Sequence, residues 1–532
     1  MIYRLTLLVS LISSCLAKEP LKILVYNVKF GHSHSSFLGN IADILSEEGH
    51  NVTSLIPEIY PPLADGTTKS TVVRIPADPS NLEFYLKGVQ EDFSFLYRND
   101  DWDKTNMVRQ MPFLRQIFEK QCEFTLTFEK TIEDLKKEKF DVMIAETRDY
   151  CGIGLSHLIS PRSLITVAST NIFDYLSYQI GQPLFPSHLP ASFGGSVNPH
   201  SITSRIDNLI AMFTSFWMFR EIEKPAERLF KRKYGENFPD MAEIIANSAF
   251  TLTNSDPFLD IAKPTLRKVI EIGGIGLKKA KKIDEEWESS LSLRPRTVLV
   301  SFGTVARAFL MPLSMKKSIA EAFSRFPDTT FIWKYEKPEE KEEFASGVDN
   351  LILTKWMPQN DLLEDNRVQG FLTHAGKASY FEAASRGKSS LLVPLFGDQL
   401  RNAAAAEFVG IGKHLDKEDL NDSDKLEAAL RETLEDEGRL ARAREVRRVM
   451  ESRPFTPREL LVKHVEFAGK FGALKTLQSQ GRELSYIVYY NIDIVGILVV
   501  ILFLTTYLFC RSLHFVFTYV RVRKVEEKLK TH

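Results

Sequence analysis

A strand, a turn and a helix between Gly370 and Gly387 form the segment with the clearest chemical pattern. The expected strand gives way to a turn that contains His374 and Gly376, and the helix starts around Ser379. Backbone N–H groups and the dipole at the N-terminus of a helix can hold a diphosphate. His374 can donate a further hydrogen bond to the same group. The segment therefore predicts a site for a phosphorylated ligand.

Residues on either side of this turn could bind the other parts of a nucleotide and a sugar. Trp356 offers a flat ring for a base, and Glu382, on the same helical face as Ser379, is suited to accept hydrogen bonds from ribose hydroxyls. Asp398 and Gln399 follow the next expected strand and could bind sugar hydroxyls. Taken singly, each residue has an ordinary explanation, because tryptophan is mostly buried and a helical glutamate is mostly solvated. The prediction depends on their combination.

Two stretches of alternating strands and helices must position these residues. The expected strands of the first stretch are 21–28, 51–57, 140–145 and 164–168. The expected strands of the second stretch are 297–302, 331–333, 351–353, 368–373 and 390–395. Strand–helix–strand alternation predicts parallel sheets with right-handed crossovers. We therefore expect an α/β protein with two doubly wound, Rossmann-like domains that face a cleft at the carboxyl ends of their strands.

Composition excludes several other classes of protein. The 532 residues carry 68 Lys and Arg against 69 Asp and Glu, a formal charge of −1, and a nucleic-acid partner would need a surplus of cations. The four cysteines contain no Cys-x-x-Cys pair, which argues against a disulfide scaffold and a zinc ribbon. Whether Cys122 and Cys151 pair is left open by the sequence.

Both ends of the chain indicate a membrane protein. Residues 1–17 have an early positive charge, an apolar run and a small residue before a charged stretch, which is typical of a secretory signal peptide. Residues 491–510 predict one transmembrane helix, and residues 511–532 form a basic tail that the positive-inside rule places in the cytosol. Lys528 and Lys530 resemble a dilysine retrieval signal. We expect a single-pass type I protein of the endoplasmic reticulum membrane, with lumenal catalytic domains.

The remaining predicted boundaries follow from these patterns. An N-terminal acceptor-binding domain is expected at 18–277, a linker at 278–296, a ligand-binding domain at 297–450, and helices that pack back and approach the membrane at 451–490. Asn51 and Asn421 begin glycosylation sequons, which suits a lumenal glycoprotein, although the sequence does not decide whether either is modified.

The motifs together resemble the nucleotide-sugar signature of the UDP-glycosyltransferases, in particular the membrane-anchored UDP-glucuronosyltransferases of animals. The matching elements are W-x-P-Q from Trp356 to Gln359, T-H-x-G-x-x-S-x-x-E from Thr373 to Glu382, and P-x-x-x-D-Q from Pro394 to Gln399. The resemblance implies the GT-B fold and a UDP-sugar as co-substrate, with no other cofactor and no metal. It departs from the family at Asp365-Asn366, at Ala375 and at Gly387-Lys388, positions that bear on loop geometry.

In the terms of that family, each donor-site residue has an expected role. Trp356 would stack on uracil, within the W-x-P-Q element that contains Gln359, and Glu382 would bind ribose. His374, Gly376 and Ser379 would surround the diphosphate, with a second contact from the turn of Ser301, Gly303 and Thr304. Asp398 and Gln399 would hold the donor sugar.

The family's catalytic pair maps onto the first half of the chain. Its base corresponds to His34 in Ser33-His34, with His32 as the nearby competitor. A histidine at a helix N-terminus is biased toward the neutral form that can accept a proton from an acceptor hydroxyl. The partner carboxylate corresponds to Glu146, where the family has aspartate, and Asp149 is a rival. Asp141, inside the expected strand, is more suited to a structural role.

The resemblance implies an inverting transfer of a sugar, glucuronic acid in most animal members, to a hydroxyl of a small lipophilic phenol, sterol or xenobiotic, as in detoxification. UDP-glucose is the alternative donor, and Arg401 is a candidate for a uronate carboxylate. Residues 210–219 could line an acceptor pocket, contact a membrane or lie in the core.

Two Asp-x-Asp motifs, at 101–103 and 422–424, leave a metal-dependent transferase as a rival. A non-catalytic lumenal binding protein is another. A homo-oligomer is possible.

Overall fold

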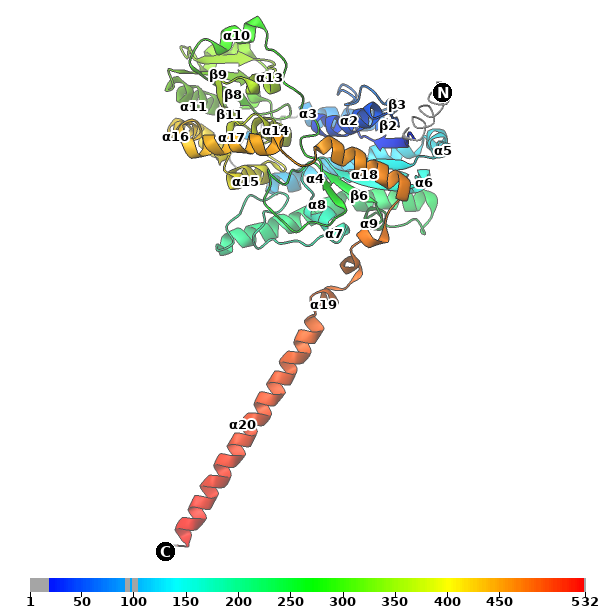
Figure 1. Ribbon diagram of the computed structural model, residues 1–532, viewed down its shortest axis with the longest axis vertical. Helices are drawn as coiled ribbons and strands as arrows, with labels where there is room; N and C mark the ends of the chain where they lie inside the picture. Colours follow the sequence, from blue (N-terminus) through cyan, green and yellow to red (C-terminus); the bar gives the residue numbers. More distant parts are fainter. Residues whose placement is uncertain (1–18, 91–95, 98–103, 531–532) are drawn as a thin grey trace, which may run out of the picture. The chain divides into compact units, whose positions relative to one another are not determined.

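The computed structural model describes residues 19–90, 96–97 and 104–530 of the chain (Figure 1). The predicted signal peptide, residues 1–17, lies outside the described residues. The chain divides into two compact units, Met1–Gln478 and Ser479–His532.

The first unit contains two parallel sheets, as the sequence predicted. The order of the first sheet is β3-β2-β1-β4-β5-β6-β7. Its strands are β1 (Lys22–Tyr26), β2 (Asn51–Pro57), β3 (Thr71–Ile75), β4 (Val142–Glu146), β5 (Ser163–Ala168), β6 (Phe250–Thr253) and β7 (Val269–Glu271). The central strands form because nearly continuous apolar runs can be buried on both faces of a parallel sheet.

The second sheet repeats the plan with the order β10-β9-β8-β11-β12-β13. Its strands are β8 (Arg296–Ser301), β9 (Thr329–Lys334), β10 (Leu351–Thr354), β11 (Val368–Thr373), β12 (Ser389–Leu392) and β13 (Gly412–His414). In both sheets the strand order reverses beside the first strand, between β1 and β4 and between β8 and β11. Ligands of doubly wound sheets bind at such reversal points.

Helices connect the strands and cover the sheets. Those of the first half are α2 (His32–Glu47), α3 (Pro79–Gln90), α4 (Lys104–Leu126), α5 (Glu129–Lys137), α6 (Cys151–Ile159), α7 (Asp174–Gln179), α8 (Ile202–Tyr234) and α9 (Met241–Ala246). Those that follow are α10 (Glu285–Leu291), α11 (Leu313–Ser324), α12 (Lys341–Phe344), α13 (Gln359–Glu364), α14 (Lys377–Ser385), α15 (Gln399–Val409), α16 (Ser423–Glu435), α17 (Glu437–Glu451) and α18 (Pro457–Phe471). The interval predicted as a linker, 278–296, includes α10.

Helix α18 returns from the second sheet to the first. Its buried residues Leu461, Val462 and Val465 belong to the same apolar cluster as Ile23 and Val25 of β1. Figure 1 shows this helix beside the elements of the N-terminal half. The two halves are therefore held by a late segment of the chain as well as by their connecting loop.

A disulfide joins α4 to the start of α6. Cys122 and Cys151 are bonded, with their Cα atoms 5.6 Å apart. This answers the pairing question that the sequence left open. The bond holds the start of α6, which follows the loop after β4, against α4. Asn51 and Asn421, the two sequon asparagines, both lie exposed.

The second unit holds α19 (Tyr486–Tyr489) and α20 (Ile492–Leu529). Helix α20 has 38 residues and a window of mean hydropathy 2.5, which fits a single-pass membrane anchor. At 1.5 Å per residue it is about 57 Å long, whereas the hydrocarbon core of a bilayer is about 30 Å thick. The span predicted at 491–510 is therefore the first part of a longer helix, and the basic tail continues that helix.

Candidate active site

Three strand ends of the first sheet converge on His34. The residue lies in the first turn of α2, just after β1, while Glu146 ends β4 and Ser169 follows β5. Nδ1 of His34 is 2.7 Å from Oε1 of Glu146 and 2.8 Å from Oγ of Ser169. The Ser169 hydroxyl also donates to Oε1 of Glu146. A proton on Nδ1 shared with this carboxylate leaves Nε2 of the imidazole as a proton acceptor.

The environment distinguishes His34 from its neighbour. The His34 side chain is 12% exposed and its ring lies 4.7 Å from that of Phe30, whereas His32 is exposed. Burial alone would raise the pKa of Glu146, but the charge and hydrogen bond of His34, the charge of Arg148 and the Ser169 hydroxyl lower it below its usual value. Glu146 therefore stays ionised beside the imidazole.

The rival carboxylate, Asp149, has a different partner. It accepts a 2.6 Å hydrogen bond from the hydroxyl of Tyr26. Burial raises the pKa of Asp149 to about 7, and the negative charge of Glu146 adds to the effect. Of the two candidates, Glu146 is thus the one in contact with His34, and its extra methylene does not prevent that contact. Asp141 accepts a bond from the backbone N–H of Lys22 in β1, which is a structural role.

Two residues of this cluster were missing from the sequence prediction. Ser169 carries no motif of its own, and only the fold brings it to Glu146. Arg148 lies two residues after Glu146, with Nε 4.0 Å from its Oε1, and its guanidinium lies 5.2 Å from the centre of the Phe173 ring. The signal that could have identified Arg148 in the sequence is an arginine two residues after a predicted catalytic carboxylate.

The second sheet places His374 between two turns. A Cβ atom on Gly303 would lie 2.7 Å from Nε2 of His374, and one on Gly376 would lie 2.5 Å from it. Only glycine leaves room for the imidazole at these positions, and Gly303 also has a φ of 83°. Burial lowers the pKa of His374 to about 4, against the opposing effects of Ser301 and Asp398. The ring is therefore neutral near pH 7 and has one N–H donor, for which the backbone carbonyl of Ser301 is one acceptor.

Other groups of the expected diphosphate site lie on the same turns. Ser301 is buried at the end of β8 and its hydroxyl accepts from the backbone N–H of Gly303 at 3.4 Å, while Thr304 is exposed on that turn. Nζ of Lys334, at the end of β9, donates to the carbonyl of Gly303 at 2.5 Å. Lys334 was not predicted. Its position at the carboxyl end of the strand next to β8 is the signal that could have identified it.

The expected nucleoside contacts form a connected group at α13 and α14. The side-chain amide of Gln359 donates to Oγ of Ser379 at 3.1 Å and to Oε2 of Glu382 at 2.5 Å. Burial raises the pKa of Glu382, while the bond from Gln359 opposes the shift. Trp356 is 70% exposed, so its ring is accessible to a base.

The expected sugar contacts lie at the start of α15. Asn402 donates to Oδ2 of Asp398 at 2.9 Å and to the carbonyl of Ala375 at 3.0 Å, which links the two turns. The side-chain carbonyl of Gln399 accepts from the backbone N–H groups of Leu395 and Phe396 at 2.8 and 3.0 Å. The Gln399 side chain thus stabilises the loop that precedes it, and its amide NH2 group is the part suited to contact a sugar.

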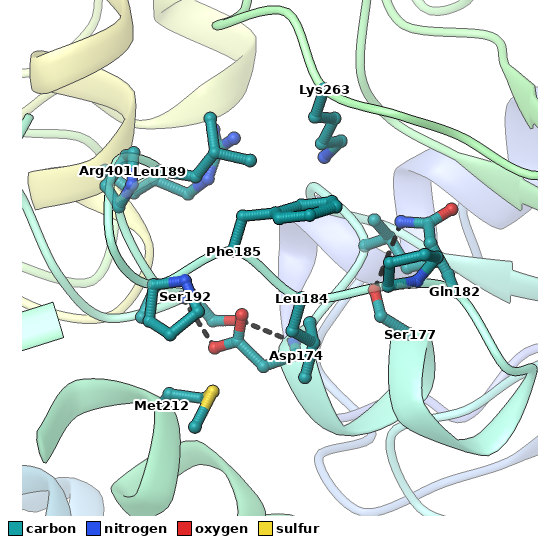
Figure 2. Close-up of a pocket in the computed structure, with 15 residues that line it drawn as sticks. Asp174, Ser177, Gln182, Leu184, Phe185, Leu189, Ser192, Met212, Lys263 and Arg401 are labelled. Carbon is teal, nitrogen blue, oxygen red and sulfur yellow. Dashed lines mark hydrogen bonds between the residues drawn. The ribbon is translucent and has the colours of Figure 1, made fainter. Parts of the chain in front are cut away.

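Arg401 joins the two halves of the unit. Its guanidinium makes two bonds with Asp260, of 2.8 and 3.1 Å, and both side chains are buried. The sequence suggested Arg401 as a candidate for a uronate carboxylate, and this paired position does not suit that role. A pocket of about 40 Å³ between the halves is lined by Arg401, Lys263, Asp174, Phe185 and Met212 among others (Figure 2). Ligand pockets usually measure about 300–1,000 Å³, so this one is too small for a sugar.

Helix α8 contains the segment predicted as a core, membrane or acceptor element, residues 210–219. Ala211, Ser215 and Phe219 are buried, whereas Phe213 and Trp217 are 64% and 42% exposed. The segment is therefore a core element on one face and leaves large apolar side chains on the other.

Of the two Asp-x-Asp motifs, residues 101–103 lie outside the described residues. In the other, Asp422 caps α16 by accepting from the backbone N–H groups of Asp424 and Lys425. Asp424 pairs with Arg325 at 2.5 Å. The carboxylates of this second motif thus have structural partners.

The two doubly wound sheets have the strand order and arrangement of the GT-B fold. Among solved structures of this fold, the calicheamicin glycosyltransferase CalG4 aligns with a TM-score of 0.57 at 15% identity, over 85% of this chain and all of its own. UGT2 of Phytolacca americana, complexed with UDP-2fluoro-glucose and pterostilbene, gives a TM-score of 0.56 at 15% identity with the same coverage.

The family described as UDP-glucoronosyl and UDP-glucosyl transferase matches residues 21–528, and the chain belongs to it. UDP-glucuronosyltransferase 1A7 of Mus musculus is 26% identical over 491 residues, with 88% of this chain and 87% of the mouse protein covered. The Caenorhabditis elegans relative ugt-55 is 30% identical over 438 residues, covering 79% of this chain and 81% of its own. The resemblance inferred from the motifs is confirmed, and the chain is a UDP-glycosyltransferase.

Proposed function

We propose that this chain transfers glucuronic acid from UDP-glucuronic acid to a hydroxyl of a small lipophilic acceptor, with His34 as the general base. The observation that carries the proposal is the contact of Nδ1 of His34 with Glu146 and Ser169, which aims the opposite ring nitrogen away from the protein's own carboxylate. The mouse relative named a UDP-glucuronosyltransferase supports the choice of sugar. UDP-glucose remains the alternative donor, because the family includes glucosyltransferases.

The reaction follows from these contacts. Nε2 of His34 takes the proton of the acceptor hydroxyl as that oxygen attacks the anomeric carbon from the side opposite UDP. The bond from the anomeric carbon to the phosphate oxygen breaks, UDP leaves, and the α-linked donor becomes a β-glycoside. Glu146 stabilises the imidazolium that forms, because its pKa lies below the usual value and the carboxylate stays ionised.

The leaving diphosphate gains negative charge, and the second sheet offers groups that can stabilise it. The neutral imidazole of His374, the turn of Ser301, Gly303 and Thr304, and the N-terminus of α14 near Gly376 and Ser379 can all donate hydrogen bonds. The partly buried cation of Lys334 lies against the Gly303 carbonyl and adds favourable charge.

The other donor contacts keep their predicted roles in this proposal. Trp356 stacks on uracil, and Glu382, positioned by Gln359, binds the ribose. Asp398, positioned by Asn402, and the amide of Gln399 bind hydroxyls of the sugar.

A donor screen tests the proposal. Microsomes that contain the full chain are given radiolabelled UDP-glucuronic acid, UDP-glucose or UDP-xylose with 1-naphthol, with and without EDTA. We expect a β-glucuronide, identified by NMR, at a rate that EDTA does not change. A preference for UDP-glucose would refute the sugar assignment, loss of activity with EDTA would favour the metal-dependent alternative, and UDP binding without product would favour a non-catalytic protein.

The membrane arrangement is part of the same proposal. With α20 as the anchor and Arg511, Arg521 and Arg523 beyond its most apolar part, we propose a type I protein of the endoplasmic reticulum with residues 18–490 in the lumen. In sealed microsomes, added protease should remove only the C-terminal tail. Digestion of the catalytic domains before detergent is added would refute this orientation.

A further inference from the structure

Arg148 has a guanidinium with hydrogen-bonding capacity that the described part of the chain leaves unused. Among the described residues its Nε is buried without a hydrogen-bond partner, and its approach to Glu146 is 4.0 Å, too long for a hydrogen bond. The side chain is 21% exposed, so part of it faces solvent-accessible space. Arginine carries five N–H donors and remains charged at all physiological pH values. Such a group, held in place over an aromatic ring, is suited to bind an anion.

The Phe173 ring helps to position the Arg148 side chain. Its guanidinium lies 5.2 Å from the centre of the Phe173 ring, in the loop that follows β5. Two residues earlier in that loop, Asn171 donates to Asn402 of α15 at 3.4 Å, and Asn402 in turn donates to Asp398. Arg148 therefore lies where the loop of the first half approaches the sugar end of the donor site.

A structural role for Arg148 as the partner of Glu146 does not explain this geometry. An arginine that serves a carboxylate usually makes two parallel N–H···O bonds, as Arg401 does with Asp260. Oε1 of Glu146 is instead occupied by His34 and Ser169. Oε2 of Glu146 is buried without a hydrogen-bond partner among the described residues, although the guanidinium is near.

Charge indicates which anion the site would take. Burial lowers the pKa of Arg148, while the negative charges of Glu146 and Asp398 both raise it, so both carboxylates act on this one cation. A uronate carboxylate bound here would face both of these negative charges, so direct N–H···O bonds from the guanidinium must hold it. A neutral sugar would not need this cation.

We propose that Arg148 is the specificity-determining residue that binds the carboxylate of the transferred sugar, and so selects a uronic acid over a neutral hexose. This inference rests on the proposed function and takes the place of the sequence candidate Arg401, which is held by Asp260. Glu146 and His34 act on the acceptor, Asp398 holds sugar hydroxyls, and Arg148 lies among them to bind the C6 carboxylate.

The test compares Arg148→Gln and Arg148→Lys in the full-length chain, with 1-naphthol as a neutral acceptor. UDP-glucuronic acid is compared with UDP-xylose, which has the same ring without the C6 group. We expect Arg148→Gln to lower kcat/KM for UDP-glucuronic acid about 30- to 100-fold more than that for UDP-xylose, as for a lost charge-assisted hydrogen bond. A smaller loss shared by both donors would reflect the charge that Arg148 exerts on Glu146. Arg148→Lys should retain part of the discrimination, because it keeps the charge without the planar fork. The exposed Arg220→Gln is the matched control and should leave both values unchanged.

Equal losses with both donors would overturn the proposal, because Arg148 would then act through Glu146 and His34. Unchanged kcat/KM values with both donors would overturn it as well. A binding arm separates this inference from the proposed function: in a His34→Ala background, UDP-glucuronic acid and UDP are compared by titration. If the wild type transfers no sugar but Arg148→Gln still weakens UDP-glucuronic acid alone, the proposed reaction fails and the Arg148 site stands.

Discussion

The two sheets of the catalytic unit share the same order over six strands, to which the first sheet adds β7, and they place their chemical groups at equivalent positions. In the first sheet, His34 follows the first strand, Glu146 ends the fourth and Ser169 follows the fifth. In the second, the groups at the ends of β8, β11 and β12 occupy the same three places. A doubly wound sheet thus provides a fixed set of strand ends, and the residues found there decide what each half does.

Each half places a histidine of the predicted site at such a strand end, and the two differ in their surroundings. His34 shares Nδ1 with a carboxylate that stays ionised, whereas His374 is packed between Gly303 and Gly376 and has a pKa of about 4. A histidine beside a carboxylate can hold a proton during a reaction, and one that is desolvated acts as a neutral donor. The comparison teaches that the role of each imidazole follows from its neighbours rather than from its place in the fold.

The largest expected effect separates the two histidines. We expect His34→Ala to lower kcat about 10³-fold, because the acceptor hydroxyl loses its base, and to leave the affinity for UDP unchanged. His374→Ala should instead weaken UDP binding roughly 10-fold or more through a lost hydrogen bond to the diphosphate. Turnover and UDP titration are measured on both variants. His32→Ala, at an exposed neighbour, is the control, and undiminished turnover of His34→Ala would refute the assignment.

The second prediction concerns stability in the first half. The pKa of Asp149 is about 7 in the folded protein and 3.8 in its ordinary state, so unfolding releases a proton at intermediate pH. Stability is therefore unaffected below about pH 4 and falls as the pH rises to 7, by up to about 4 kcal/mol. Asp149→Asn should raise the free energy of unfolding of the catalytic unit at pH 8 by up to that amount and have little effect at pH 4. A gain of equal size at both pH values would contradict the mechanism.

His374, in the second half, should make the free energy of unfolding depend on pH in the opposite direction to Asp149. Because the folded pKa of His374 lies near 4, below the usual 6.5, its contribution to stability falls as the pH drops from about 6.5 to 4.

The third prediction tests the carboxylate beside His34. Glu146→Gln should lower kcat roughly 10²-fold, since the imidazolium loses its stabilising charge while the side chain keeps its shape. Because the pKa of Glu146 is lowered, the loss should be constant from pH 5 to 8. Glu146→Asp keeps the charge with a shorter reach and should lose less. If Glu146→Asp were as inactive as the glutamine variant, distance rather than charge would control the pair.

Local sequence patterns define more of the predicted site in the second half than in the first, for a physical reason. The donor-site residues from Trp356 to Gln399 lie in one continuous stretch, so local strand, turn and helix patterns fix their neighbours. The cluster at His34 combines residues from three distant segments, and the sequence could not show that Ser169 reaches Glu146 or that Asp149 bonds Tyr26. Tertiary packing decides which distant residues pair, as Arg401 does with Asp260, and local sequence patterns do not predict such pairs.

The smallest expected effect is at the entrance of the donor site. Trp356 is 70% exposed, so its truncation removes little buried surface and should leave the thermal unfolding temperature nearly unchanged. If its ring stacks on uracil, Trp356→Ala should weaken UDP binding by about 1–2 kcal/mol, or 5- to 30-fold, because stacking of a base on an aromatic ring contributes this much. Trp356→Phe should restore part of the affinity, and kcat at saturating donor should be unchanged in both variants. Trp217→Ala, which removes another exposed tryptophan from α8, is the matched control. UDP affinity that is unaffected in Trp356→Ala would show that the second half recognises the diphosphate and sugar without the base, and would remove the uracil contact from the donor site.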